Sequence, residues 1–259
     1  MNVKVSLKTS LAAGIGLVAL LAVAGVVAKV NYGRPPALGL PVPVTSPSAR
    51  ASPSPDDPLT AACRAPSRPP NSTELAGLWM IEPGSIVGYR AHEKFASLPA
   101  PGEAVARTDR VAGWLLVSGQ GTSYKVDTGC IAVDVRTLRS IDEVPGFDTR
   151  DRDQNVRGFL RTDGNPFAIF RPYSSTMNAN PASTTALTVS VSGDFEVAGI
   201  TKPAKFSLTI KRQAERLGVA GQASIDTDQY ALELPRTAAD FVVVDPHIVV
   251  EVSLLLGKV

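Results

Sequence analysis

From Trp79 to the end of the chain, apolar and polar residues alternate with a period of two, and turn residues separate the runs. Successive side chains of a β-strand point to opposite faces, so each run predicts a strand with one buried face and one face toward solvent. The alternation is regular in residues 204–212 and 247–255. The pattern therefore predicts an all-β fold of antiparallel strands with little helix.

We expect about eight strands from these runs and the turns between them. They are predicted near residues 79–91, 107–117, 123–126 together with 130–138, 167–174, 186–197, 204–212, 219–226 and 247–255. A sheet of this size either splits into a sandwich or closes into a barrel, which removes its exposed edges. The alternation alone does not choose between the two. One short helix is predicted from Asp148 to Leu160, with Gly164 and Pro166 after its end.

The N-terminal part of the chain has a different character. Residues 1–8 contain two lysines, and residues 9–28 carry no charge. An apolar run of this length can cross about 30 Å of hydrocarbon as a helix, whereas the apolar part of a cleaved signal peptide has about 7–15 residues. We therefore predict a cytoplasmic N-terminus and a transmembrane signal anchor. The alternative is a signal peptide that is cleaved after Ala28.

A proline-rich segment follows the predicted anchor. Residues 34–70 hold more than half of the 21 prolines of the chain and no aromatic residue. Such a segment buries too little apolar surface to offset the entropy of ordering it. We predict a disordered linker over residues 29–73 and a single folded domain over residues 74–259.

The composition excludes several classes of function. The net charge of +2 and the absence of a basic stripe argue against a nucleic-acid partner. With two His and two Cys in the chain, we expect no metal site. No nucleophile–base pair and no phosphate-binding loop is apparent, so we expect no catalytic residues and no enzyme.

The two cysteines are Cys63, at the end of the linker, and Cys130, inside a predicted strand. Ile131 and Val133 share one face of that strand, which places Cys130 on the opposite, outer face. A disulfide between the two cysteines and a pair of free thiols both remain open.

Glu93 is the one acidic residue that the alternation could turn inward. It continues the face of Val87, Tyr89 and Ala91. Either the strand has ended and Glu93 lies at the rim of the fold, or its carboxylate lies near the head of a ligand. A buried carboxylate requires a partner.

Three segments carry a resemblance to a known family. Residues 79–85 (WMIEPGS) are similar to an opening W-x-I-D-P-x-x-S strand, and residues 152–170 (RDQNVRGFLRTDGNPFAIF) to an R-D-x-H-L-R helix followed by Y-P-x-x-x-F. Residues 186–211 are similar to a G-x-L-x-hydrophobic-x-G-V-T-K-P hairpin, carried by Gly193, Gly199, Ile200, Thr201, Lys202 and Pro203. With these segments the chain resembles the YceI-like, polyisoprenoid-binding family from about Gly77 onward. It differs at Asn155 and Asn165, where the family has His and Tyr.

The resemblance implies an extended, lipocalin-like barrel of eight antiparallel strands with an apolar interior. It also implies an isoprenoid lipid as partner, either a quinone or a polyprenyl chain, and no other cofactor. With the anchor, the protein would be a single-pass protein of the cell membrane with its barrel outside the cytoplasm. The alternative is a non-catalytic interaction domain with a filled core.

The inner face of the strands supplies the candidate lining of a ligand tunnel. These residues are Val87, Tyr89, Val133, Val135, Phe170, Val189, Val191, Phe195, Phe206, Leu208, Ile210, Ile225, Ile248, Val250 and Val252. Each of them either contacts a ligand or fills the core.

Overall fold

The structure is a computed structural model that describes residues 34–42, 57–67, 74–98, 101–235 and 241–259. The chain divides into the units Met1–Pro36 and Ala37–Val259, and the second unit holds every element described below. The predicted anchor, residues 9–28, lies outside the described residues. Within the described ranges, no helix has both the length and the apolar character needed to cross a bilayer.

The described residues are mostly β structure. The strands are β1 (Gly77–Ile81), β2 (Ile86–Phe95), β3 (Gly102–Thr108), β4 (Val111–Gln120), β5 (Ser123–Asp134), β6 (Arg139–Ser140), β7 (Phe167–Pro172), β8 (Ser175–Asn178), β9 (Leu187–Val197), β10 (Ile200–Gln213), β11 (Arg216–Asp226), β12 (Val242–Val244) and β13 (His247–Lys258). The helices are α2 (Pro58–Ala62) and α3 (Thr149–Phe159), with two 3-10 turns, η1 (Val135–Thr137) and η2 (Thr227–Tyr230).

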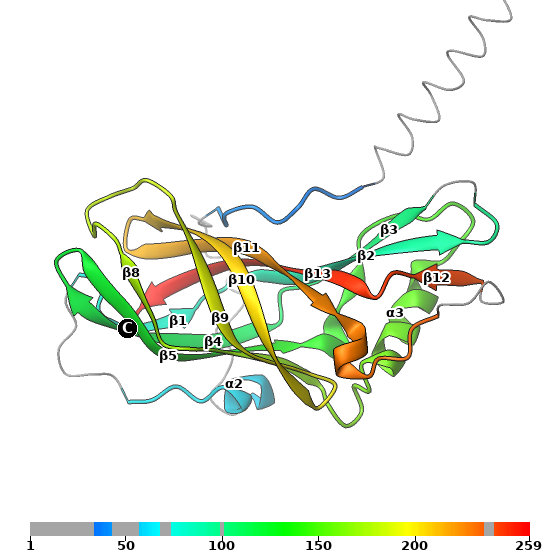
Figure 1. Cartoon of the computed structure of the whole chain (residues 1–259), viewed down its shortest axis with the longest axis horizontal. Coiled ribbons are helices and arrows are strands. Elements are labelled where there is room, and N and C mark those ends of the chain that lie inside the picture. The colour runs from blue at the N-terminus through cyan, green and yellow to red at the C-terminus, as the bar shows by residue number, and fades with distance from the viewer. Residues whose placement is uncertain (1–33, 43–56, 68–73, 99–100, 236–240) are drawn as a thin grey trace, which may run out of the picture. The chain divides into compact units, whose positions relative to one another are not determined.

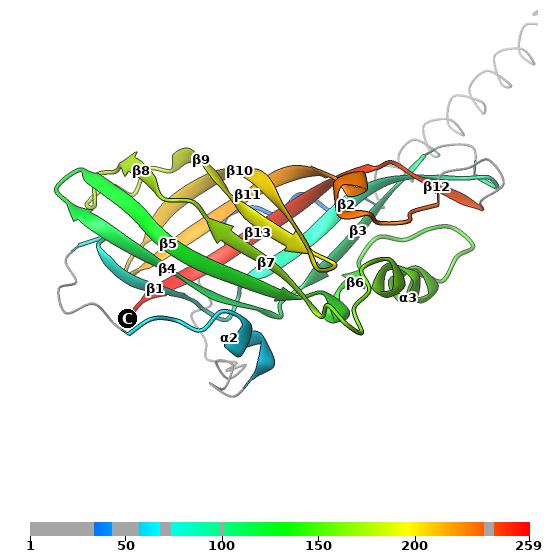
Figure 2. The same ribbon diagram turned by 60° about the horizontal axis from the view of Figure 1, so that its bottom comes forward.

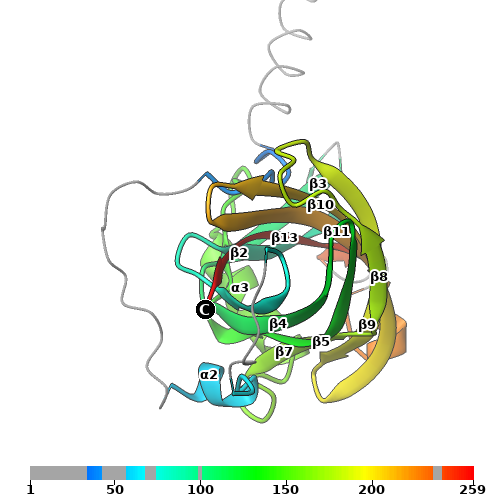
Figure 3. The same cartoon turned by 90° about the vertical axis from the view of Figure 1, so that its left-hand side faces the viewer.

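Eight of these strands form a closed antiparallel barrel. Their order is β1-β4-β5-β7-β9-β10-β11-β13, and the pairing of β1 with β13 closes the circle. In that pairing Trp79 lies opposite Lys258. Figure 3 looks along the barrel and shows the ring of strands. The prediction of an all-β, eight-stranded barrel is confirmed.

The barrel has two different ends. At one end β13 also pairs with β2, and β2 pairs with β3 and β12, so the sheet continues beyond the barrel. Helix α3 lies at this end (Figures 1 and 2), which we call the helix end. At the opposite end lie the turns of the β4–β5 and β10–β11 hairpins, and we call it the hairpin end.

Three predicted strands are wrong in detail. The run near residues 79–91 is two strands, β1 and β2, with residues 82–85 between them. The run near residues 107–117 is two strands, because the ladder breaks at Asp109 and Arg110: β3 pairs with β2 and β6, whereas β4 pairs with β1 and β5. The amide of Arg110 donates to the hydroxyl of Thr108 across this break, at 3.0 Å. The run near residues 130–138 ends at Asp134, whose carboxylate accepts from the amide of Arg136 and begins η1. Polar side chains that bond to nearby amides favour turns over an extended ladder.

The prediction of one helix after residue 148 is confirmed. Asp148 caps α3, and its carboxylate accepts from the amide of Arg150 at 3.0 Å. Asp153 on the buried side of the helix accepts from the amide and the hydroxyl of Ser140, at 3.0 and 2.7 Å. These bonds fix α3 to β6 at the helix end.

The β9–β10 hairpin turns in two residues. Ala198 and Gly199 both have positive φ, 52° and 78°. Positive φ at both central positions is the geometry of a type I′ turn, whose twist matches that of the flanking strands. The turn fixes the register in which Val191 lies opposite Phe206.

We expected no ordered structure over residues 29–73, but part of that range folds onto the barrel. Helix α2 buries Leu59 against an apolar patch on the outer face of β4 and β5. The patch includes Ala112, Trp114 and Ala132, so this outer face is apolar and not polar as the alternation suggested. A few buried side chains are enough to order the segment once the barrel supplies a surface for them.

A disulfide holds the same segment. Cys63, directly after α2, is bonded to Cys130 on the outer face of β5. Asp57 at the start of α2 accepts from Arg110 at 2.6 Å. The pairing that the sequence left open is therefore present, and it joins the end of the proline-rich segment to the wall of the barrel.

Candidate functional site

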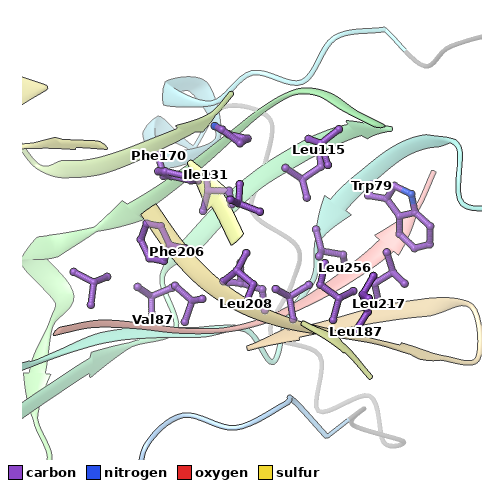
Figure 4. A pocket seen from close by; sticks show the side chains of 18 of the residues that line it. Trp79, Val87, Leu115, Ile131, Phe170, Leu187, Phe206, Leu208, Leu217 and Leu256 are labelled. Atoms are coloured by element: carbon purple, nitrogen blue, oxygen red, sulfur yellow. The ribbon is translucent and has the colours of Figure 1, made fainter. Parts of the chain in front are cut away.

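The barrel encloses a cavity of about 440 Å³. Strands from all around the barrel contribute apolar side chains to its wall (Figure 4). In that view Phe170 and Phe206 lie in one part of the cavity, while Trp79, Leu217 and Leu256 lie in another. The volume falls within the range of about 300–1,000 Å³ that is usual for small-molecule sites. Side chains therefore do not fill the interior.

Almost all of the residues proposed from the alternation line this cavity. They are Val87, Tyr89, Val133, Val135, Phe170, Val191, Phe195, Phe206, Leu208, Ile210, Ile225, Ile248, Val250 and Val252. Val189 does not reach it and packs against the adjoining core cluster.

The same alternation, continued along each strand, predicts further lining residues. Leu254 and Leu256 continue the inner face of β13, and Ile131 precedes Val133 on β5. The prediction lacked Leu115 and Val117 of β4, because both faces of that strand are apolar and alternation does not separate them. The loop between β8 and β9 also lines the cavity, and no periodicity marks a loop.

At the helix end, the ring of Tyr89 lines the cavity from the inner face of β2. Burial raises the pKa of Tyr89 well above its usual range, and the nearby carboxylate of Glu93 acts in the same direction. The hydroxyl therefore stays protonated over the physiological range and can donate a hydrogen bond.

Glu93 lies beyond Tyr89 on the same strand and does not line the cavity. It is 6% exposed, and its carboxylate lies 3.7 Å from Nε of Arg152. Arg152 comes from α3, and its Nη1 and Nη2 donate to both carboxylate oxygens of Asp142 at 2.9 and 2.8 Å. The rim position left open for Glu93 is wrong, because β2 continues to Phe95 and Arg152 of α3 supplies the counter-charge to a buried carboxylate. A position beside the head of a ligand in the cavity is not shown either, since Glu93 lies outside the lining.

The environment of Glu93 changes its acidity. Burial, the larger effect, raises the pKa of this carboxyl above its usual value, and the guanidinium of Arg152 acts in the opposite direction. Asp142 adds a second negative charge nearby, which also raises the pKa of Glu93. A buried cluster with more carboxylates than guanidinium groups therefore lies next to the helix end of the cavity.

The hairpin end of the cavity is polar in a different way. Tyr124 is buried there and donates to the carboxylate of Glu74 at 2.5 Å. Burial and this hydrogen bond raise the pKa of Tyr124 to about 12. The polar side chains that join the lining at this end are Asn178, Asn180, Ser183 and Thr185 from β8 and the β8–β9 loop, and Arg212 from β10.

The lining offers little for catalysis. Among the described residues that line the cavity there is no His, Cys, Asp, Glu or Lys. Nor do the described ranges bring three His, Cys, Asp or Glu side chains together where a metal ion could bind. His247 lies outside the cavity at the exposed start of β13, where its amide donates to Asp245 at 2.8 Å. The arrangement is suited to holding an apolar molecule.

Comparisons with known proteins place this fold. The family model described as "YceI-like domain" matches residues 102–256. Among solved structures, the chain is similar to a polyisoprenoid-binding domain from Saccharophagus degradans implicated in plant cell wall breakdown. The two share 16% identity with a TM-score of 0.49, over 70% of this chain and 98% of that one.

A second solved structure, Burkholderia cenocepacia BcnA, shares 13% identity with a TM-score of 0.46. That match covers 68% of this chain and 98% of BcnA. Comparison of the sequence with curated proteins gave no match.

Proposed function

The chain belongs to the YceI-like family, and on this premise we propose that it is a non-enzymatic carrier that holds an isoprenoid lipid in its barrel. The lipid would be a quinone or a polyprenyl chain. The observation that carries the proposal is the apolar cavity of about 440 Å³ that the barrel strands enclose.

The physical driving force is the burial of hydrocarbon. Each methylene group that leaves water for an apolar wall contributes about 0.8 kcal/mol, so one five-carbon unit contributes several kcal/mol before the costs of ordering it. No precise polar geometry is required along the chain. Lining residues such as Leu208, Val250 and Leu254 are apolar.

The alternative of an interaction domain with a filled core is less well supported. A filled barrel of this size would leave voids no larger than a few water molecules, because protein interiors pack to the density of organic crystals. The observed cavity is far larger than that. A carrier function explains why so much apolar surface faces an empty space.

We further propose that residues 9–28 anchor the protein in the membrane with its barrel outside the cytoplasm. The uncharged run supports an anchor, and the Cys63–Cys130 disulfide supports an oxidising compartment. Intact-mass measurement of protein extracted from membranes should give a chain that still contains residues 9–28. A mature chain that starts at Lys29 would show that the segment is a cleaved signal peptide. Protease added to intact cells should release the barrel.

The carrier proposal predicts that filling the cavity displaces lipid. Val191→Phe keeps the wall apolar and adds a ring to the interior opposite Phe206. Mass spectrometry of lipids that co-purify with the protein should find an isoprenoid in the wild type and several-fold less in the variant. The melting temperature should change little, because the ring enters open space.

Ser190→Phe is the matched control, since Ser190 is the neighbouring residue on the exposed face of β9. It should leave the lipid content unchanged. If Val191→Phe instead keeps its lipid and loses stability by about 1–3 kcal/mol, as overpacking of a filled core does, the interaction-domain alternative is correct.

A further inference from the structure

Arg212 is the one charged residue among the described residues that line the cavity. It follows Phe206, Leu208 and Ile210 on the inner face of β10 and lies opposite Leu217 in the β10–β11 hairpin. The strand thus ends its run of apolar inward residues with a guanidinium group at the hairpin end.

The guanidinium of Arg212 is held by neutral groups. Its Nε donates to the carbonyl of Ala214 at 3.0 Å, and its Nη1 donates to the carbonyl of Pro181 in the β8–β9 loop. No carboxylate of the described residues forms an ion pair with it. The carboxylate of Glu74 accepts a hydrogen bond from Tyr124, another lining residue, and not from Arg212. The positive charge at this end of the cavity therefore has no counter-charge from the protein's described part.

The two ends of the cavity differ in charge, because carboxylates outnumber guanidinium groups at the helix end. The residues that act electrostatically on Tyr89 there are the carboxylates of Glu93, Asp142 and Asp153 and the single guanidinium of Arg152. An anionic group at that end would meet an excess of negative charge in a poorly solvated environment, where such repulsion is strong.

We propose that Arg212 binds the anionic head, a phosphate or a carboxylate, of an amphiphile whose apolar chain lies in the cavity. This inference rests on the carrier function proposed above and specifies the class of lipid. A guanidinium presents several donors in a rigid fork that fits phosphate and carboxylate oxygens, and such charge-assisted bonds are stronger than neutral ones. The head would lie at the hairpin end, beside the polar side chains of the β8–β9 loop, and the chain would point toward Tyr89.

The test compares lipids that share a chain and differ in the charge of the head. The full chain, solubilised in one detergent, is titrated with geranylgeranyl phosphate and with geranylgeraniol. The wild type should bind the phosphate about tenfold more tightly, which corresponds to about 1.4 kcal/mol. Arg212→Gln, which can still donate to a carbonyl, should lose this preference, and Arg212→Lys should keep part of it.

Lys211→Gln is the matched control, because it removes the same charge from the adjacent residue of β10, whose side chain alternates to the outer face. It should leave the preference for the phosphate unchanged. Palmitate and hexadecanol, titrated in the same way, distinguish the two sources of the anionic head: a preference for palmitate as large as that for the isoprenoid phosphate points to fatty acids.

The outcomes separate this inference from the carrier function. If none of the four lipids binds to the wild type or to the variants, the carrier function fails. If the uncharged lipids bind and Arg212→Gln leaves the head preference unchanged, the role of Arg212 fails while the carrier function stands. A preference that is lost in Tyr89→Phe and kept in Arg212→Gln would place the head at the helix end and overturn the inference.

Discussion

Replacing Arg152 with methionine should destabilise the protein by about 3–5 kcal/mol, the usual effect of removing one partner from a buried ion pair. Its side chain is 14% exposed, and those of Glu93 and Asp142 are 7% and 3% exposed. Without the guanidinium, both carboxylates remain buried with their counter-charge gone. Urea unfolding at neutral pH measures the change.

Arg150→Met on the same helix is the control for this prediction. Arg150 is 87% exposed and pairs with Asp148 in solvent, so its loss should leave the unfolding midpoint almost unchanged. If Arg152→Met is as mild as Arg150→Met, the buried cluster does not hold α3 on the barrel.

The effect of Arg152→Met should also depend on pH. Burial already raises the pKa of Glu93, and loss of the opposing guanidinium raises it further. A carboxyl whose pKa is higher in the folded state binds more protons there than in the unfolded state. The stability of the variant therefore falls as the pH rises through that pKa. The deficit relative to wild type should be smaller at pH 5 than at pH 7.5, and a deficit that grows toward acid would contradict this assignment.

The second large effect concerns the disulfide. Cys63 and Cys130 are 67 residues apart, and in the chain-entropy model a loop of that size stabilises the fold by about 4 kcal/mol. The double variant Cys63→Ala/Cys130→Ala should lose about that much in urea unfolding. Replacing both cysteines avoids leaving a reactive thiol on the barrel.

The wild type, unfolded without reductant, serves as the control for the disulfide prediction. Alkylation of that sample should label neither cysteine, whereas alkylation after reduction should label both. A double variant as stable as the oxidised wild type would show that the bond leaves the folding equilibrium unaffected. The contacts of Leu59 and the ion pair of Asp57 with Arg110 would then hold α2 in place.

The sequence alone determined which side chains face the interior. Period two is a local property of an extended chain, so the inward direction of Val87, Val191 and Leu208 follows once each segment is a strand. The start of α3 at Asp148 was equally local, because a capping carboxylate acts on amides of its own first turn. The family resemblance then selected a barrel over a sandwich.

The tertiary structure decided what local patterns do not contain. Whether the barrel interior is filled depends on how strands distant in sequence curve around it and on the summed volume of their side chains, which no single run reveals. The buried partner of Glu93 comes from α3, and the surface that orders α2 comes from β4 and β5. Likewise, the role proposed for Arg212 depends on its hydrogen bond to the β8–β9 loop and on the distant carboxylates of the helix end. Sequence fixes the direction of a side chain because backbone geometry is local, whereas charge pairing and open space arise only when separate segments meet.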